Sequence, residues 1–266
     1  MTWLLPLAAF GFGGIVGSFL NVVIHRYPRE ESIVFPPSSC PNCRTKIKPW
    51  DNVPILSYLW LLGRCRACRE PISPRYPLVE LANALFWLAI FLRTGLSVSF
   101  LPIAALVSMT IVLIYIDLEI QILPDAIDLP GVAIGLLIGW LNLGALYPDL
   151  MLSPTLADSV IGAIAGAGVL LAIAVTYKLI RKIEGMGLGD VKMMAMLGAT
   201  VGWEPLIPLM LIATITGAIA GALLALKSRE GMKTAIPFGV FLGLAFLVTI
   251  FFGPKLTGWY LTLLVP

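Results

Sequence analysis

Long apolar stretches, broken by Pro, Gly or charged residues, recur along the whole chain. A helix that crosses about 30 Å of hydrocarbon needs about 20 apolar residues, so each stretch is a candidate membrane span. Because backbone groups in lipid must be satisfied internally, we expect the spans to be helices in one bundle. The pattern predicts about eight spans, with seven or nine as alternatives, near residues 3–24, 78–93, 99–116, 127–147, 156–180, 190–203, 205–226 and 236–253.

The composition agrees with this pattern. Hydrophobic residues make up 59% of the 266 positions and charged residues only 12%, and the mean hydropathy is +0.94. These values lie outside the usual range of soluble domains. The sequence therefore predicts an all-α polytopic membrane protein whose main partner is the lipid bilayer.

The basic residues are unevenly distributed, which predicts an orientation. Nine of the eighteen Lys and Arg residues lie between Arg26 and Arg75. Loops rich in Lys and Arg stay in the cytoplasm, so we expect this segment to be cytoplasmic and the N-terminus to be outside. Arg26 is the first charged side chain, so the first apolar run is expected to be a retained span and not a cleaved signal. A nucleic-acid partner is not needed to explain the net charge of +3.

The same pattern predicts how the chain is organised. We expect a first transmembrane helix at 1–25, a cytoplasmic cysteine-rich domain at 26–77 and a transmembrane domain at 78–266. Glycine pairs at helical spacing, such as Gly13/Gly17 and Gly162/Gly166, allow close helix approach. They indicate ordinary packing inside the bundle, with an oligomer interface as the alternative.

Four cysteines form two CxxC pairs in the basic loop: Cys40, Cys43, Cys65 and Cys68. Two such pairs can close a tetrahedral thiolate shell around Zn²⁺, which predicts a zinc-ribbon-like loop. A redox dithiol, or reduced cysteines without metal, is the alternative. A four-thiolate shell leaves no open position for water, so the zinc would be structural. His25, the only histidine, is expected to be interfacial, although a role as ligand or base is also open.

Two carboxylates stand at span ends on the cytoplasmic side. Asp117 ends the third span, and Asp190 follows three glycines, Gly185, Gly187 and Gly189, at the start of the sixth. Acidic groups at membrane depth are costly and usually functional. Glycines at alternate positions allow unusual backbone conformations and close approach of a partner. If the two carboxylates meet across the bundle, one keeps a proton and the other stays charged, which supplies an acid and a base.

Three further acids share the turn with Asp117: Glu119, Asp125 and Asp128. They are expected to be capping or ion-pairing groups, and binding of a basic substrate segment is the alternative. An ion-coupled transporter that uses the same carboxylates is a second function class. It predicts carboxylates near the bilayer midplane, whereas these stand at span ends. A membrane-anchored zinc scaffold is a third, but it leaves the glycine-rich run before Asp190 unexplained.

Five segments in order resemble the bacterial type IV prepilin peptidases of the GxGD aspartyl protease class. They are Gly17-Ser-Phe-Leu-Asn-Val-Val-Ile-His-Arg26, the paired CxxC motifs, Arg75-Tyr-Pro-Leu-Val-Glu80, the Asp117 segment and Gly185-Met-Gly-Leu-Gly-Asp190. The resemblance covers nearly the whole chain.

The resemblance implies a catalytic pair, Asp117 and Asp190, that cleaves the basic leader of type IV prepilins and type II secretion pseudopilins. Cleavage follows a Gly on the cytoplasmic side of the bacterial inner membrane. It also implies N-methylation of the new terminus with S-adenosylmethionine, a function associated with the cysteine-bearing domain. The sequence does not indicate which residues contact S-adenosylmethionine, the oligomeric state, or whether the two aspartates are close at rest.

Overall fold

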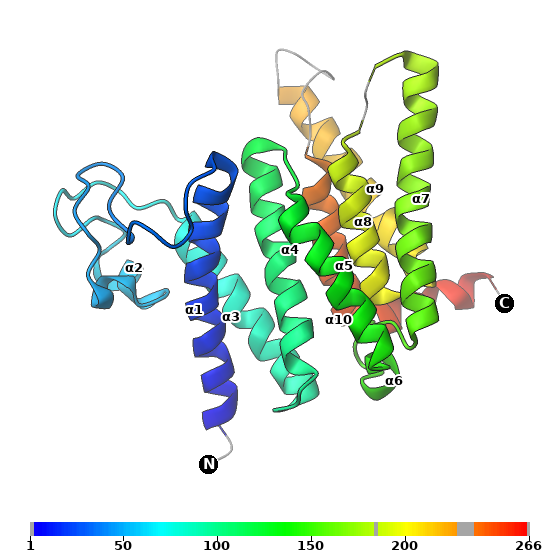
Figure 1. Cartoon of the computed structure of the whole chain (residues 1–266), viewed down its shortest axis with the longest axis horizontal. Helices are drawn as coiled ribbons and strands as arrows, with labels where there is room; N and C mark the ends of the chain where they lie inside the picture. The colour runs from blue at the N-terminus through cyan, green and yellow to red at the C-terminus, as the bar shows by residue number, and fades with distance from the viewer. Residues whose placement is uncertain (1–2, 184–185, 228–236, 265–266) are drawn as a thin grey trace. The chain divides into compact units, whose positions relative to one another are not determined.

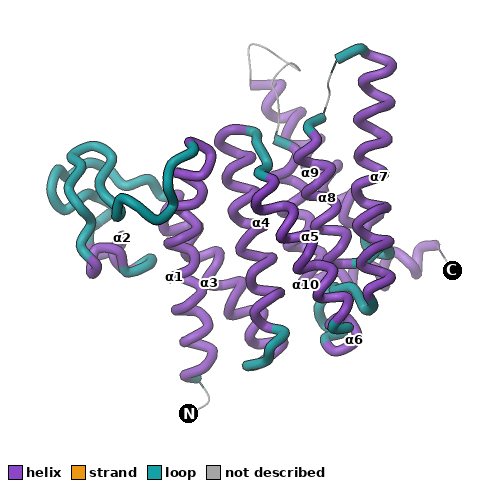
Figure 2. Tube along the Cα trace, in the orientation of Figure 1, coloured by secondary structure: helices purple, strands orange, loops and turns teal. Residues whose placement is uncertain are grey.

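The computed structural model describes residues 3–183, 186–227 and 237–264, and within these ranges the protein is helical, with two isolated β-bridges and no strand (Figures 1 and 2). The chain divides into two compact units, residues 1–112 and 113–266. The α-helices are α1 Leu4–Arg26, α2 Leu56–Trp60, α3 Arg75–Thr94, α4 Phe100–Ile120, α5 Asp125–Trp140, α6 Leu143–Leu146, α7 Leu156–Arg181, α8 Leu188–Val201, α9 Leu206–Lys227 and α10 Phe238–Leu264; two 3₁₀ turns are η1 Tyr27–Arg29 and η2 Pro49–Asn52.

The prediction of an all-α membrane protein is confirmed, and each predicted span overlaps a helix. The predicted span 127–147 is wrong as one helix, because α5 ends at Trp140 and the left-handed Asn142 separates it from the short α6. Within the described residues, six helices are long and apolar enough to cross a membrane: α1, α3, α4, α7, α9 and α10. The remaining two, α5 and α8, have only 16 and 14 residues. At about 1.5 Å per residue they are roughly 24 and 21 Å long, shorter than the hydrocarbon core of a bilayer.

The predicted end of the last span at residue 253 is wrong, because α10 continues through Pro254 to Leu264. Proline has no N–H, so the carbonyl of Ile250 loses its partner inside the helix. The backbone N–H of Met151 donates to that carbonyl at 2.8 Å instead. Met151 lies in the connection between α6 and α7. Because its N–H satisfies the Ile250 carbonyl, the helix can continue past Pro254 without an unpaired backbone group.

In the first unit, α1 packs against α3 with very little space between the backbones. A Cβ added to Gly17 would lie 2.7 Å from the Cα of Glu80, and one added to Gly13 would lie 2.9 Å from the Cα of Ala84. The buried side chain of Asn83 donates to the carbonyl of Gly13 at 2.7 Å and accepts from a serine hydroxyl of α4 at 2.8 Å. Small residues and buried amide hydrogen bonds therefore join these helices, as is usual in membranes.

In the second unit, α8 is the central helix and packs against α5, α7 and α10. A Cβ on Gly162 of α7 would overlap the carbonyl of Gly198 in α8, so the two backbones touch. On the other side, a Cβ on Gly135 of α5 would lie 2.8 Å from the Cβ of Ala199. The glycine pairs of α1 and α7 thus pack within their own units, which confirms the prediction of ordinary packing.

Candidate active site and cysteine cluster

Asp117 lies in the last turn of α4 and is held from two directions. Its carboxylate oxygen Oδ2 accepts a hydrogen bond at 3.0 Å from the backbone N–H of Val240, in the first turn of α10. Its backbone carbonyl accepts at 2.9 Å from the N–H of Gln121, which has a left-handed conformation and ends the helix. The side chain is only 4% exposed. A carboxylate at the N-terminus of a helix also interacts favourably with the helix dipole, so α10 holds Asp117 in position.

Asp190 is the third residue of α8 and is partly exposed. The backbone N–H of Gly187, the N-cap residue, donates to its carboxylate. This is the geometry in which an acidic residue at the third helical position satisfies an unpaired N–H of the first turn. Asp190 is therefore part of the helix start and not a freely moving side chain.

Leu123 and Gly239 bring these two carboxylates to one place. Leu123 follows α4, and its Cβ lies 2.9 Å from where a Cβ of Gly189 would stand. Gly239 lies against both Leu123 and Asp117, because a Cβ there would lie 3.0 Å from Cδ1 of Leu123 and 2.8 Å from Oδ2 of Asp117. Asp117 is also near enough for its charge to act on Asp190. The structure thus gathers, within the second unit, the two acids that the sequence places 73 positions apart.

Three helices begin around this place. The first turns of α5 and α8 are joined by an ion pair between Asp125 and Lys192, with Nζ to Oδ1 at 2.6 Å, and the two helices run parallel. The first turn of α10 contacts Asp117. Helix N-termini carry partial positive charge, so their convergence offsets part of the cost of burying carboxylates here.

The other three acids of the turn have different environments. Asp125 is exposed and paired with Lys192, which agrees with the ion-pairing prediction for it. Glu119 is exposed on α4. Asp128, one turn further along α5, is fully buried, and neither of its carboxylate oxygens has a hydrogen-bond partner among the residues that the structure describes. Its charge interacts with those of Asp125, Lys192 and Asp190.

The glycines before Asp190 were expected to adopt backbone conformations that other residues avoid, and Gly187 does not. Gly185 lies outside the described residues. Gly187 has φ −75° and ψ 149°, an extended conformation that any residue can adopt, and a Cβ there would meet no close atom. The expected unusual backbone is therefore absent at this position. At Gly189 the reason for glycine is space, because Leu123 fills the position of a side chain.

Sequence reasoning missed Gly239, Leu123 and Lys192. A signal existed for Gly239, since it stands in the first turn of an apolar helix directly after Pro237-Phe238. The sequence gives no signal for Leu123, because nothing distinguishes it from other leucines that lie beside turns. Lys192 was visible as a lone cation inside an apolar segment, which in a membrane protein predicts an acidic partner.

The four cysteines form a compact cluster in the first unit. Their Sγ atoms all lie within 4.8 Å of one another, and those of Cys40 and Cys68 are 3.8 Å apart. A tetrahedron with metal–sulfur bonds of about 2.3 Å has sulfur–sulfur edges of about 3.8 Å. The cluster therefore has the donors and the spacing for one tetrahedral metal ion.

The two CxxC segments repeat one backbone design. In the first segment, the N–H of Cys40 donates to the carbonyl of Thr45, and the N–H of Arg44 donates to the carbonyl of Cys40. In the second segment, the N–H of Cys65 donates to the carbonyl of Glu70, and the N–H of Arg69 donates to the carbonyl of Cys65. Arg44 and Arg69 both have positive φ, 55° and 62°. Each turn points its backbone N–H groups toward its own sulfurs, an arrangement that stabilises thiolates.

This surrounding shifts the protonation of the thiols. The hydroxyl of Thr45 lowers the pKa of Cys43 to about 6. Backbone N–H groups of Cys68 and Ala67 lower the pKa of Cys65. The backbone N–H of Glu70 acts in the same direction on Cys68, but burial and the other three sulfurs outweigh it and raise its pKa to about 11. Cys43 and Cys65 therefore favour the thiolate, which is the form that binds a metal cation.

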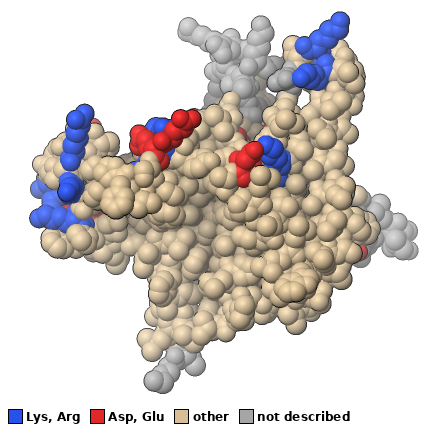
Figure 3. Space-filling view, in the orientation of Figure 1, with Lys and Arg blue, Asp and Glu red and all other residues tan. Residues whose placement is uncertain are grey.

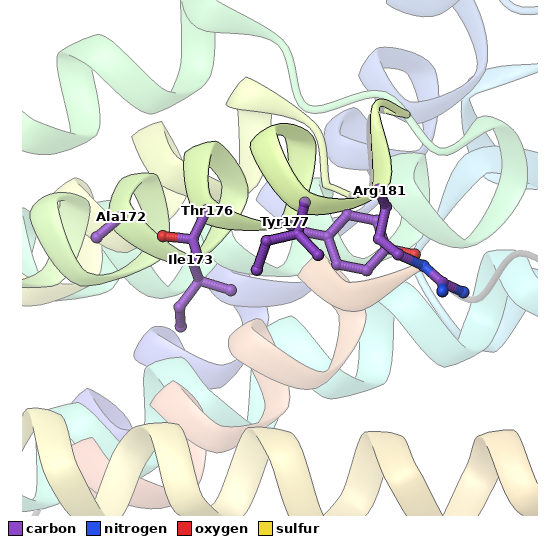
Figure 4. Close-up of a pocket in the computed structure, with 6 residues that line it drawn as sticks. Ala172, Ile173, Thr176, Tyr177 and Arg181 are labelled. Atoms are coloured by element: carbon purple, nitrogen blue, oxygen red, sulfur yellow. The ribbon is translucent and has the colours of Figure 1, made fainter.

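A hollow of about 680 Å³ lies along one face of α7, lined by Ala172, Ile173, Thr176, Tyr177, Ile180 and Arg181 (Figure 4). These residues follow one another at helical spacing and point to the same side of the helix. The described residues that line this hollow include neither Asp117 nor Asp190.

The fold and these two sites define a class: a multi-pass membrane protein with carboxylates gathered at helix ends and a tetracysteine cluster. The chain belongs to the type IV leader peptidase family. Residues 104–222 match the model of the Type IV leader peptidase family, and residues 12–94 match that of the Bacterial Peptidase A24 N-terminal domain.

Curated relatives match the chain almost end to end. The Prepilin leader peptidase/N-methyltransferase of Aeromonas hydrophila is 37% identical over 290 residues, covering 98% of this chain and 96% of the relative. The protein of the same name from Pseudomonas putida is 37% identical over 266 residues, covering 92% and 89%. That from Burkholderia pseudomallei (strain 1026b) is 38% identical over 300 residues, covering 97% and 92%. No solved structure matches the chain.

Proposed function

We propose that this protein is a prepilin peptidase of the bacterial inner membrane that removes the basic leader of prepilins, with Asp117 and Asp190 as its catalytic pair. The observation that carries the proposal is the convergence of these two carboxylates around Leu123 and Gly239. Family membership and the name shared by the relatives supply the substrate class.

Two neighbouring carboxylates suit peptide hydrolysis because they hold one proton between them. The ionised carboxylate takes a proton from a water molecule as that water attacks the peptide carbonyl. The protonated carboxyl stabilises the developing oxyanion and then protonates the leaving amine. Asp117 is the more rigidly held of the two, since Val240 and α10 fix it, while Asp190 is the more exposed.

The exposed acids around the site fit a basic leader. Glu119 and Asp125 are accessible at the helix ends, and Asp128 is buried behind Asp125. We propose that the first two contact the leader and that Asp128 adds negative charge behind them. Type II secretion pseudopilins, which would present the same leader chemistry, are included as substrates. The excess of Lys and Arg between α1 and α3 supports a cytoplasmic position for the loop, with the N-terminus outside.

We further propose that the cysteine cluster holds one structural Zn²⁺ through Cys40, Cys43, Cys65 and Cys68. Zinc bound there would fix the two CxxC turns against each other, and the closed thiolate shell leaves no position for a reacting water. The complete cysteine set and the relatives' name support N-methylation of the new terminus, with S-adenosylmethionine as the methyl donor. We assign no residue to that donor.

The test uses purified protein in lipid with a synthetic prepilin peptide and S-adenosylmethionine, analysed by mass spectrometry. Wild type is compared with Asp117→Asn, Asp190→Asn and a variant with all four cysteines changed to serine. We expect both Asn variants to lose leader removal by at least about a thousandfold, because no other acid replaces either partner. The matched control is Asp149→Asn, which changes an acid in the connection between α6 and α7.

The outcomes separate the parts of the proposal. Full cleavage by either Asn variant would refute the catalytic pair and make Asp125 and Asp128 the next candidates. Methylation of a pre-cleaved peptide by the Asn variants would place the two activities at separate sites. A serine variant that retains stoichiometric zinc would refute the metal assignment.

A further inference from the structure

Residues 53–63 form an apolar segment inside the loop between α1 and α3, and we name it the apolar wedge. Its sequence is Val-Pro-Ile-Leu-Ser-Tyr-Leu-Trp-Leu-Leu-Gly, and no charged residue occurs between Asp51 and Arg64. It is too short to cross a membrane but long enough to enter one leaflet and return. Within a basic loop that was expected to lie wholly in water, such a run needs a physical explanation.

The wedge lies beside α1 and not beyond its end. Pro54 contacts α1 at Gly14, where an added Cβ would be 3.4 Å from the proline Cβ. Gly14 precedes Arg26, near the end of α1, by twelve residues, which corresponds to about 18 Å along the helix. Figure 1 shows α2, the central part of the wedge, at the level of the middle of α1 and to one side of it. The wedge therefore returns toward the middle of a predicted span.

A buried acid anchors the wedge at this depth. The side chain of Glu80, only 8% exposed, accepts a hydrogen bond at 2.7 Å from the backbone N–H of Ile55. Glu80 stands five residues into α3, or about 8 Å from the start of that helix. Ile55 has φ 63°, an unfavourable conformation for a β-branched residue that persists only where its surroundings impose it. The contacts with Gly14 and Glu80 supply that constraint.

The outer face of the wedge is covered with large apolar side chains. Leu62 is 84% exposed, Leu59 61%, Leu56 54% and Trp60 49%. In water this would be a contiguous apolar patch of the kind that marks a membrane or protein contact. It continues directly from the faces of α1 and α3, which must themselves meet lipid.

The flanks of the wedge carry the residues that favour a membrane surface. Lys48 lies over the ring of Trp50, 5.4 Å from its centroid, before the wedge. Arg64 and Arg66 follow the wedge. Arg66 forms a bidentate ion pair with Asp51, which precedes the wedge, so the pair joins the two ends of the segment. Lys and Arg gather over this loop in Figure 3. Aromatic and basic residues around an apolar centre are typical of segments seated in an interface that contains anionic lipid.

We propose that the apolar wedge is embedded in the leaflet on the loop's side of the bilayer, with lipid acyl chains as its partner. Leu56, Leu59, Trp60 and Leu62 contact lipid, and the basic flanks contact phosphate groups. The second CxxC segment starts one residue after Arg64, so the wedge holds the cysteine cluster at the membrane surface. A membrane-embedded substrate emerges at that surface, which brings its end to the cluster.

The test measures depth directly. A small fluorescent amino acid replaces Leu59 or Leu62, or Lys46 as the exposed, polar control in the first CxxC segment. Each protein is reconstituted into vesicles of phosphatidylcholine and phosphatidylglycerol and quenched by iodide in water or by lipid spin-labelled near the headgroup. We expect the spin-labelled lipid to quench positions 59 and 62 at least about twofold more than position 46, and iodide to show the reverse order.

Quenching by iodide at positions 59 and 62 equal to that at 46 would overturn the proposal, because the wedge would then lie in water. Protection from both quenchers would also overturn it, since protein, such as a second copy of this chain, would cover the wedge. Should the labelled proteins fold poorly, a lipid-borne photoreactive probe on the unmodified protein gives the same answer, with labelling expected in the peptide spanning 51–64. None of these measurements requires leader cleavage, so their outcome is independent of the proposed function.

Discussion

Replacing Gly239 by alanine tests whether the position of Asp117 sets the activity. The new Cβ would stand 2.8 Å from Oδ2 of Asp117 and 3.0 Å from Cδ1 of Leu123. Ordinary carbon–carbon contact begins near 3.5 Å, so both groups must move by roughly half an ångström, and the hydrogen bond from Val240 must lengthen or break. A misplacement of about 1 Å costs about a hundredfold in rate, so we expect kcat for leader removal to fall roughly 10- to 100-fold.

The matched control is Gly168→Ala in α7, where an added Cβ meets nothing within 4 Å. This change should leave activity unaltered and raise stability by about 0.5–1 kcal/mol, the usual gain of alanine over glycine inside a helix. Both variants are assayed by mass spectrometry of cleaved peptide and by thermal unfolding in the same lipid. Gly239→Ala with wild-type kcat would refute the reasoning, because Asp117 would then tolerate displacement or take no part in the chemistry.

Three other substitutions test separate parts of the structure. Arg69→Gly should raise the free energy of unfolding by up to about 1 kcal/mol, because it removes the left-handed strain at φ 62°; a lower free energy of unfolding would show that the strain is absent. Gly162→Val should lower thermal stability sharply while Gly168→Val does not, since only the first overlaps the backbone of α8; equal effects would contradict the packing. Lys192→Ala should change stability by less than about 1 kcal/mol but lower KM for basic leaders by releasing Asp125, and an unchanged KM would argue against leader binding there.

The long apolar helices were predictable because backbone groups in lipid must be satisfied within the span itself. Apolar runs found eight helices, including the short α8, whose start was placed within two residues. Two ends were wrong: the fourth span was predicted to reach residue 147, but α5 ends at Trp140, and the last span was predicted to end at 253, where the partner that satisfies Ile250 comes from Met151, about a hundred positions away. Local sequence carries no information about such a partner.

The site was predictable for its charged residues and not for those that place them. Asp117 and Asp190 stand out because acids are rare in apolar segments. Gly239 and Leu123 do not, since their importance comes from atoms they touch on other helices. Asp128 shows the same limit, because it was grouped with Asp125 and Glu119 by sequence, yet the fold buries it and leaves them exposed.

The shortness of α5 and α8 has a consequence for the membrane itself. These parallel helices start together at the carboxylates and fall roughly 6 to 9 Å short of a hydrocarbon core of about 30 Å. Hydrophobic mismatch of this size thins the bilayer around a protein or recesses the helix ends below the lipid headgroups. In either case the aqueous boundary dips toward Asp117 and Asp190. Under the proposed function, a peptide bond at the top of a membrane helix would then meet water without leaving the bilayer.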